Sequence, residues 1–237
     1  MKKNILITGK PRSGKSTLIK KLIADIPNKV GFVTSEIAGE NGRIGFQIET
    51  HAGDTAVLAH VGLETPYRVS RYSVDVQNLE SMIPKVIAFE EGDFLYLDEI
   101  GQMELFSKDF EKLVLKYLDS PNNCLATLSC VFENDFTRCL KEREDIIIVE
   151  ISAENRSEKE KFITKLIGKI EKAKKYVSEP QRFSCRGSEV ELKSEHGTRT
   201  LFNKDKKWNC DCDFFKQSGI CSHAIATQEF IKNRYSV

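Results

Sequence analysis

The sequence predicts an α/β fold: a mostly parallel β-sheet with helices on both faces, followed by a small domain that a bound metal ion stabilises. Three observations support this prediction. Short apolar runs alternate with amphipathic stretches through residue 177, a pattern typical of β-α-β units. A glycine-rich loop at residues 9–16 joins the first apolar run to the first amphipathic stretch. Three cysteines and a histidine crowd into residues 210–223.

The composition is that of an ordinary globular protein, with 237 residues, 40% hydrophobic and 30% charged. This length suits one sizeable domain and a small one. A formal net charge of +1 gives no bulk electrostatic reason for binding nucleic acid or a membrane, so local groups would have to provide one. No segment approaches the roughly 20 apolar residues that cross a bilayer. Seven cysteines without an export signal argue against a disulfide framework. We therefore expect a cytoplasmic protein.

The first part of the chain predicts a buried strand, a helix, a further strand and a hairpin. Residues 4–8 are a short apolar run typical of a buried parallel strand. Residues 16–26 have apolar positions at helical spacing and end before Pro27. Residues 30–37 predict the next strand. Residues 44–61 alternate around a polar turn, which predicts a hairpin beside the main sheet.

The next elements alternate helix and strand. A helical pattern runs from Asp75 to about Glu91, with Pro84 as a kink or a boundary. Residues 93–100 form a second buried strand that ends in two acids. Residues 107–120 predict a helix with Ser107 as its N-cap.

The composition and the pattern of predicted elements change at about residue 177. Before it, residues 124–129 and 145–151 predict strands on either side of a helical stretch, and a long amphipathic helix follows them, basic at its C-terminal end. Beyond it, residues 178–237 predict short strands and polar turns. Because so short a segment buries little apolar surface, it needs a staple such as a metal ion.

Residues 9–16 match the phosphate-binding loop G-x-x-x-x-G-K-[ST] at every fixed position. The loop also has the right context, because it follows a buried strand and opens a helix. Lys15 is expected to contact the β- and γ-phosphates, and the Ser16 hydroxyl to help hold Mg²⁺. The predicted nucleotide-binding residues are Gly9, Lys10, Pro11, Arg12, Ser13, Gly14, Lys15, Ser16 and Thr17.

The strand at residues 93–100 ends in Asp98 and Glu99. An acid at the end of a neighbouring strand is the usual second half of a phosphate-loop site, so Asp98 is expected to hold Mg²⁺. Glu99 is in place to polarise an attacking water. Our predicted catalytic residues are therefore Lys15 and Glu99. Two adjacent acids at the end of an apolar strand would be costly to bury without a cation.

With these motifs, the chain resembles a family of P-loop nucleoside-triphosphatases that includes thermophilic bacterial and archaeal enzymes and a human cancer-related one. The similarity rests first on "DEIGQMELFS" at residues 98–107. Further segments in the family's order are those at residues 31–50, 68–80, 124–129 and 150–158.

This resemblance implies a RecA/AAA-like P-loop NTPase domain in residues 1–176, with one strand separating the phosphate-loop strand from the Asp-Glu strand. It also implies Mg²⁺-dependent hydrolysis of ATP, GTP and other triphosphates. Gln102 stands where the family usually has lysine, so an arginine could compensate for the missing charge. The arginine-finger candidates are Arg43, Arg68 and Arg71. Asn155 and Arg156 follow the last strand, where Asn155 could cap the next helix or the pair could contact the base.

The cluster near the C-terminus has the ligands of a closed tetrahedral Zn²⁺ site. Cys210-x-Cys212 and Cys221-x-His223 supply three thiolates and one imidazole, a set typical of structural zinc. The spacing resembles the SWIM zinc finger, which implies a zinc-binding domain in residues 177–237. A hairpin is expected before the first ligands, and a helix is expected to begin at the last ones.

SWIM modules are associated with DNA or protein binding, so the resemblance implies a nucleic-acid or protein partner for this domain. Local basic residues and one tryptophan could form a nucleic-acid face, although neighbouring acids make a merely solvated surface equally compatible. The basic and aromatic residues are Arg182, Arg186, Lys193, Arg199, Lys204, Lys206, Lys207 and Trp208.

Three hypotheses for function remain open at this stage. The first is a nucleoside-triphosphatase that its zinc module recruits to a partner. The second is a small kinase that passes the γ-phosphate to a nucleoside or a nucleic-acid end. The third is a nucleotide-regulated adaptor with little turnover.

Overall fold

The computed structural model describes residues 1–40, 42–204 and 207–235. Contacts divide the chain into two units, Lys3–Glu160 and Lys161–Val237 together with Met1–Lys2. Each unit has its own sheet. The division falls within the long helix α5 (Arg156–Val177), whose later residues group with the C-terminal unit. The domain boundary after residue 176 stays a prediction.

The first unit is built on a nine-stranded sheet whose second half is parallel. β8 pairs with both β1 and β7, so one strand separates the phosphate-loop strand from the Asp-Glu strand, as the resemblance implied. The parallel strands, in sheet order, are β2 (Lys29–Gly39), β7 (Phe94–Ile100), β8 (Cys124–Ser129), β1 (Asn4–Gly9) and β9 (Ile146–Glu150).

The first half of the sheet is antiparallel. The predicted hairpin is present as β3 (Gly42–Thr50) and β4 (Thr55–His60). It does not lie beside the main sheet, because β3 pairs with β2 from Phe32↔Thr50 onward and so continues it. β6 (Tyr72–Val74) and β5 (Arg68–Val69) complete this flank. The sheet is therefore more mixed than predicted.

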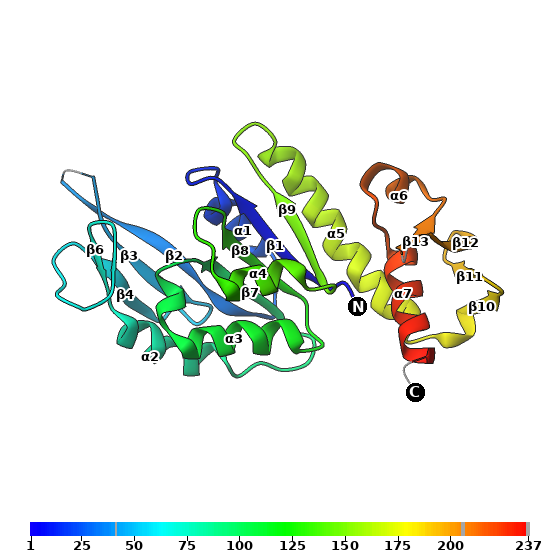
Figure 1. The fold of residues 1–237 in the computed structure, drawn as a ribbon, viewed down its shortest axis with the longest axis horizontal. Coiled ribbons are helices and arrows are strands. Elements are labelled where there is room, and N and C mark those ends of the chain that lie inside the picture. The colour runs from blue at the N-terminus through cyan, green and yellow to red at the C-terminus, as the bar shows by residue number, and fades with distance from the viewer. Residues whose placement is uncertain (41, 205–206, 236–237) are drawn as a thin grey trace. The chain divides into compact units, whose positions relative to one another are not determined.

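Helices cover both faces of this sheet (Figure 1), as predicted. α1 (Lys15–Ile23) packs on β8 and β2, while α2 (Val76–Val86), α3 (Lys108–Asp119) and α4 (Asp135–Glu142) contribute to one core cluster on the other face. The predicted cap is confirmed, because the Ser107 hydroxyl accepts from the Phe110 amide. Pro84 lies inside α2, two residues before its end.

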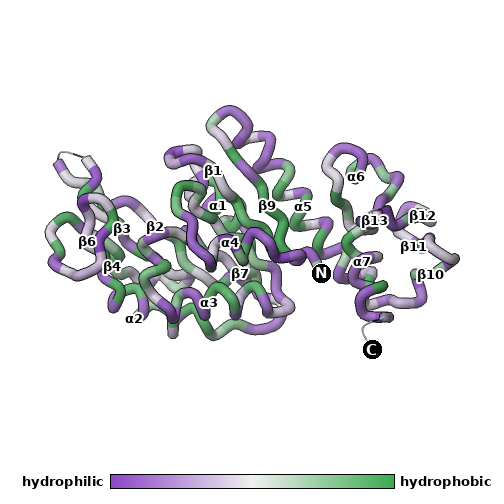
Figure 2. The backbone as a smooth tube through the Cα atoms, viewed as in Figure 1, coloured by the Kyte–Doolittle hydropathy of each residue, from purple (hydrophilic) through white to green (hydrophobic). Residues whose placement is uncertain are grey.

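Hydrophobic residues follow the strands and hydrophilic ones the loops of the first unit (Figure 2). The core includes the fully buried Leu6, Phe32 and Phe110. Burial on this scale holds the carboxyl ends of β1, β7 and β8 rigidly together, which is where the predicted site residues lie. Within the residues that the structure describes, no helix is long and apolar enough to cross a membrane.

The second unit is a small antiparallel sheet with helices. Its sheet has the order β10 (Phe183–Arg186), β11 (Glu189–Ser194), β12 (Gly197–Lys204) and β13 (Lys207–Cys210). Val190, Leu192 and Leu201 are among the buried residues of this sheet, on strands that contact α7 (Ser222–Tyr235). α6 (Asp213–Ser218) follows β13. The predicted hairpin is confirmed as β11 and β12, within a larger sheet than expected.

Candidate nucleotide site and metal cluster

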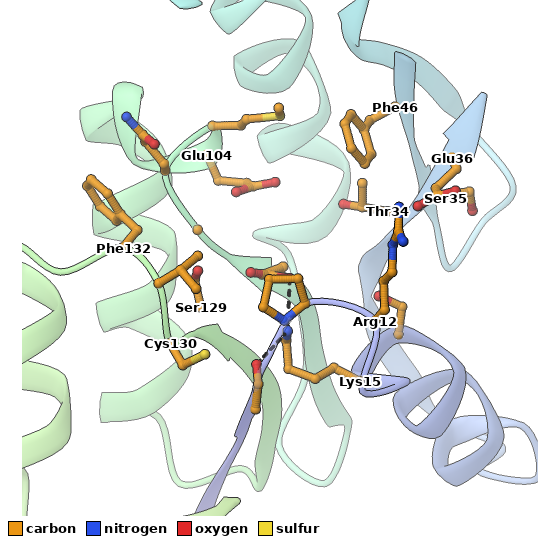
Figure 3. Close-up of a pocket in the computed structure, with 18 of the residues that line it drawn as sticks. Arg12, Lys15, Thr34, Ser35, Glu36, Phe46, Glu104, Ser129, Cys130 and Phe132 are labelled. Atoms are coloured by element: carbon orange, nitrogen blue, oxygen red, sulfur yellow. Dashed lines mark hydrogen bonds and ion pairs between the residues drawn. The ribbon is translucent and has the colours of Figure 1, made fainter. Parts of the chain in front are cut away.

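A cavity of about 800 Å³ opens at the carboxyl ends of β1, β7 and β8, beside the phosphate loop (Figure 3). The carboxyl ends of parallel strands are the usual place for ligands in α/β proteins. Of the predicted nucleotide-binding residues, those that line the cavity are Gly9, Pro11, Arg12, Gly14, Lys15, Ser16 and Thr17. Lys10 and Ser13 do not line it; Lys10 is exposed and Ser13 is buried.

The phosphate loop has the conformation that its glycines permit. Gly14 caps α1 in the left-handed region, at φ 90°, where a side chain would be strained. A Cβ there would also lie 2.2 Å from Arg156 Nη1, so the guanidinium rests against this end of the loop. The buried Ser13 hydroxyl has no hydrogen-bond partner among the described residues. An unpaired buried donor at a helix N-terminus fits a phosphate oxygen.

Lys15 and Glu99, the predicted catalytic pair, meet in this cavity. Lys15 Nζ donates to the Gly9 carbonyl at 3.1 Å and lies 3.8 Å from Glu99 Oε2. Burial raises the pKa of Glu99, while the Lys15 ammonium group lowers it. The Ser129 hydroxyl also lowers this pKa. A buried lysine therefore faces the acid that could act on water.

Asp98 is fully buried, with 0% of its surface exposed. Thr127 donates to Asp98 Oδ1 at 2.6 Å, whereas Oδ2 has no hydrogen-bond partner among the described residues. Burial raises the pKa of Asp98, and the hydroxyl groups of Thr127 and the nearby Ser16 oppose this shift. A buried carboxylate oxygen without a partner, next to a serine hydroxyl, fits a hard cation such as Mg²⁺.

The structure separates the three arginine candidates. Arg43 lines the cavity, with Nη1 2.5 Å from Glu36 Oε1 and Nε donating to the Tyr72 hydroxyl at 3.0 Å. Arg68 and Arg71 are not among the described residues that line it, and Arg71 donates to the Arg43 carbonyl instead. Gln102 is exposed at the rim of the cavity.

Four polar residues of the site were not anticipated from the sequence. Thr127 and Ser129 lie on β8 and support the two acids. Thr34 on β2 donates to the Asp98 carbonyl at 2.6 Å, and Glu104 lines the cavity from the 3₁₀ helix η1 (Glu104–Phe106). The alternation of β8 could have indicated that Thr127 and Ser129 share a face. Nothing local in the sequence indicates the other two.

The predicted metal ligands of the second unit come together. The ligand atoms of Cys210, Cys212, Cys221 and His223 all lie within 4.8 Å of one another. His223 Nδ1 is 3.6 Å from the Cys210 sulfur and 3.8 Å from the Cys221 sulfur. Three sulfurs and one ring nitrogen converging on one point fit a tetrahedral Zn²⁺ ion. His223 lies in the first turn of α7, as predicted for the last ligand.

The surroundings of this cluster favour metal binding. Hydrogen bonds from Cys221 and His223 lower the pKa of Cys210, which favours the thiolate form that binds a metal ion. The Ala224 amide donates to the Cys221 sulfur at 3.4 Å. The His223 ring stacks on Tyr176 with ring centroids 6.0 Å apart, which orients the ring.

The model of a family described as NTPase matches residues 4–164, the segment that contains the phosphate loop and both acids. The chain belongs to this NTPase family. A second model, described as the SWIM zinc finger, matches residues 190–227. All four residues of the metal cluster lie within that match.

Relatives and solved structures agree with this membership. A protein of Thermotoga sp. (strain RQ2) named nucleoside-triphosphatase THEP1 is 41% identical over 155 residues, 65% of this chain and 88% of that protein. The crystal structure of THEP1 from Aquifex aeolicus superposes with a TM-score of 0.63 at 31% identity, covering 69% of this chain and 98% of that one. The solution structure of a human cancer-related nucleoside triphosphatase has a TM-score of 0.59 at 30% identity, and the match covers 70% of this chain and 97% of that one. The RecA/AAA-like fold predicted from the resemblance is thus confirmed.

Proposed function

We propose that this chain is a cytoplasmic, Mg²⁺-dependent nucleoside-triphosphatase that hydrolyses ATP, GTP and other triphosphates to the diphosphate and phosphate. The decisive observation is Lys15 at the end of the phosphate loop, 3.8 Å from Glu99 at the carboxyl end of β7. The relatives named nucleoside-triphosphatase favour hydrolysis over the kinase and the adaptor.

The residues divide the work of the reaction. The loop from Gly9 to Thr17 wraps the phosphates with its amides, and Lys15 neutralises charge on the β- and γ-phosphates. Ser16 and Asp98 would hold Mg²⁺, which offsets phosphate charge when bound. Glu99 orients a water molecule and accepts its proton as the oxygen bonds to the γ-phosphorus. The bond from that phosphorus to the bridging oxygen breaks, and its electron pair leaves with the diphosphate.

The test is phosphate release from each of the four nucleoside triphosphates with Mg²⁺, for the wild type and for Glu99→Gln. We expect the variant to lose about 10²- to 10⁴-fold in kcat while still binding a non-hydrolysable ATP analogue. Wild-type turnover by Glu99→Gln would remove Glu99 from the mechanism. Absence of turnover with all four nucleotides would refute the triphosphatase itself.

We propose further that the zinc-binding unit holds Zn²⁺ and binds a nucleic acid. Charge supports this, because residues 161–237 contain 16 basic and 9 acidic residues, a formal charge of +7 within a chain of +1. Several predicted basic residues have acidic partners, such as Arg186 with Glu191 and Arg199 with Asp211. Lys206 lies outside the described residues. Basic residues left over for phosphates would make binding strongly dependent on salt.

Adding single- or double-stranded nucleic acid to the phosphate-release assay tests this partner. Acceleration that falls steeply with salt is the expected result. Indifference to both nucleic acids, together with no binding in a direct titration, would favour a protein partner for the zinc-binding unit.

A further inference from the structure

The nucleotide cavity contains a third acid that the reaction described above does not use. Glu104 begins η1, and 4% of its surface is exposed. Figure 3 shows its carboxyl group turned into the cavity. A carboxyl group buried at a reaction site is expensive unless something compensates for its burial.

Glu104 has no cation to compensate for its burial. Among the described residues, no ion pair involves it, and Lys15, the buried cation of the cavity, faces Glu99. Its hydrogen bonds come from the backbone at Gly101 and at Glu104 itself. Burial first, and the charges of Glu99 and Asp98 after it, raise the pKa of Glu104 to about 8. At neutral pH the group is therefore mostly a neutral acid with an O–H to donate.

The other elements packed against η1 leave this balance unchanged. Besides β7, which carries Asp98 and Glu99, these elements are α2 and α3. On α2, Glu80 accepts a hydrogen bond from the Ser107 hydroxyl at 2.7 Å. On α3, Lys108 pairs with Glu111 at 2.7 Å.

Gly101 is the link between Glu104 and the proposed base. A Cβ on Gly101 would lie 3.0 Å from Glu104 Oε2 and 3.3 Å from Glu99 Oε1. Both oxygens therefore border the same small space, which is open because residue 101 has no side chain. The two acids differ in their surroundings: Glu99 has a lysine and Glu104 has none. Neighbouring acids whose surroundings differ in this way take different protonation states.

We propose that Glu104 is a positioning residue that donates a hydrogen bond across Gly101 to the Glu99 side of the cavity, which keeps Glu99 aimed at the attacking water. This inference rests on the proposed triphosphatase function. The arrangement lets one carboxyl group act as a donor and the other as a base.

The test compares kcat and KM for the wild type, Glu104→Gln, Glu104→Leu and Glu99→Gln, with Glu91→Leu, an exposed acid outside the cavity, as control. Glutamine keeps a neutral donor, so Glu104→Gln should stay within about threefold of the wild type. Leucine removes the donor and should lower kcat about 10²-fold at nearly unchanged KM. The wild-type kcat should also fall above about pH 8, and that limb should be absent in Glu104→Gln.

Three outcomes would overturn the inference: full activity of Glu104→Leu, equal loss in both Glu104 variants with the fold intact, or a high-pH limb that persists in Glu104→Gln. Thermal unfolding and binding of a non-hydrolysable ATP analogue establish that each variant is folded. No Glu99-dependent turnover in the wild type would instead refute the proposed function, so the two failures are distinguishable.

Discussion

The nucleotide cavity and the metal cluster place their chemical groups in opposite ways. In the first unit, buried residues such as Leu6, Phe32 and Phe110 surround the strands, and this packing holds the acids of β7 in place. In the second unit, Cys210 and Cys221 are themselves part of the small buried interior. The packing of the first unit positions its site, whereas we expect the second unit to need a bound metal ion to complete its fold.

Removing zinc should have the largest effect, because it should unfold the second unit and leave the first unit folded. Chelation, or Cys221→Ser, should unfold the second unit, because structural zinc contributes free energy to folding. Trp208, the only tryptophan of the chain, lies on β13 two residues before Cys210, so its fluorescence should shift to the red. Binding of a fluorescent ATP analogue should persist.

Cys139→Ser, at an exposed cysteine outside the cluster, is the matched control and should leave the fluorescence unchanged. Loss of nucleotide binding together with the fluorescence shift would mean that the two units fold as one.

The buried Glu104 should make the stability of the first unit depend on pH. The pKa of Glu104 is about 8 in the folded protein against 4.5 for the free group. Between these values the folded state binds more protons than the unfolded state, so stability falls as pH rises. Each pKa unit corresponds to about 1.4 kcal/mol. From pH 5 to pH 8, the wild type should therefore lose several kcal/mol more than Glu104→Gln, measured by urea unfolding at each pH. Parallel losses in the two proteins would show that Glu104 does not carry this charge penalty.

A smaller effect is expected from a change beside the proposed Mg²⁺ site. Thr127→Val keeps the shape of the buried side chain but removes the donor to Asp98 Oδ1. The Mg²⁺ concentration for half-maximal activity should rise about 10- to 100-fold. Thr227→Val is the matched control, since Thr227 is equally buried and its hydroxyl has no partner among the described residues. An equal response in both variants would assign the effect to lost stability.

Local sequence patterns predicted much of this fold. The strand before the phosphate loop, the Ser107 cap and the long helix from Arg156 are local features, set by apolar spacing and by short-range hydrogen bonds. The spacing of Cys210, Cys212, Cys221 and His223 likewise predicted the cluster, because little chain has to fold back to bring ligands that are close in sequence together. The antiparallel flank was underestimated, since strand pairing joins segments whose register no local pattern specifies.

Short motifs specify which groups can do chemistry: a loop whose glycines admit phosphate, a lysine, two acids at a strand end, and four metal ligands. How those groups are charged and oriented depends on the packing of the whole fold. Thr127 reaches Asp98 because β8 lies between β1 and β7, and Arg43 rather than Arg68 or Arg71 lines the cavity because β3 joins the sheet beside β2. Glu104 differs from Glu99 for the same reason, because burial and the position of Lys15 are properties of the packed fold.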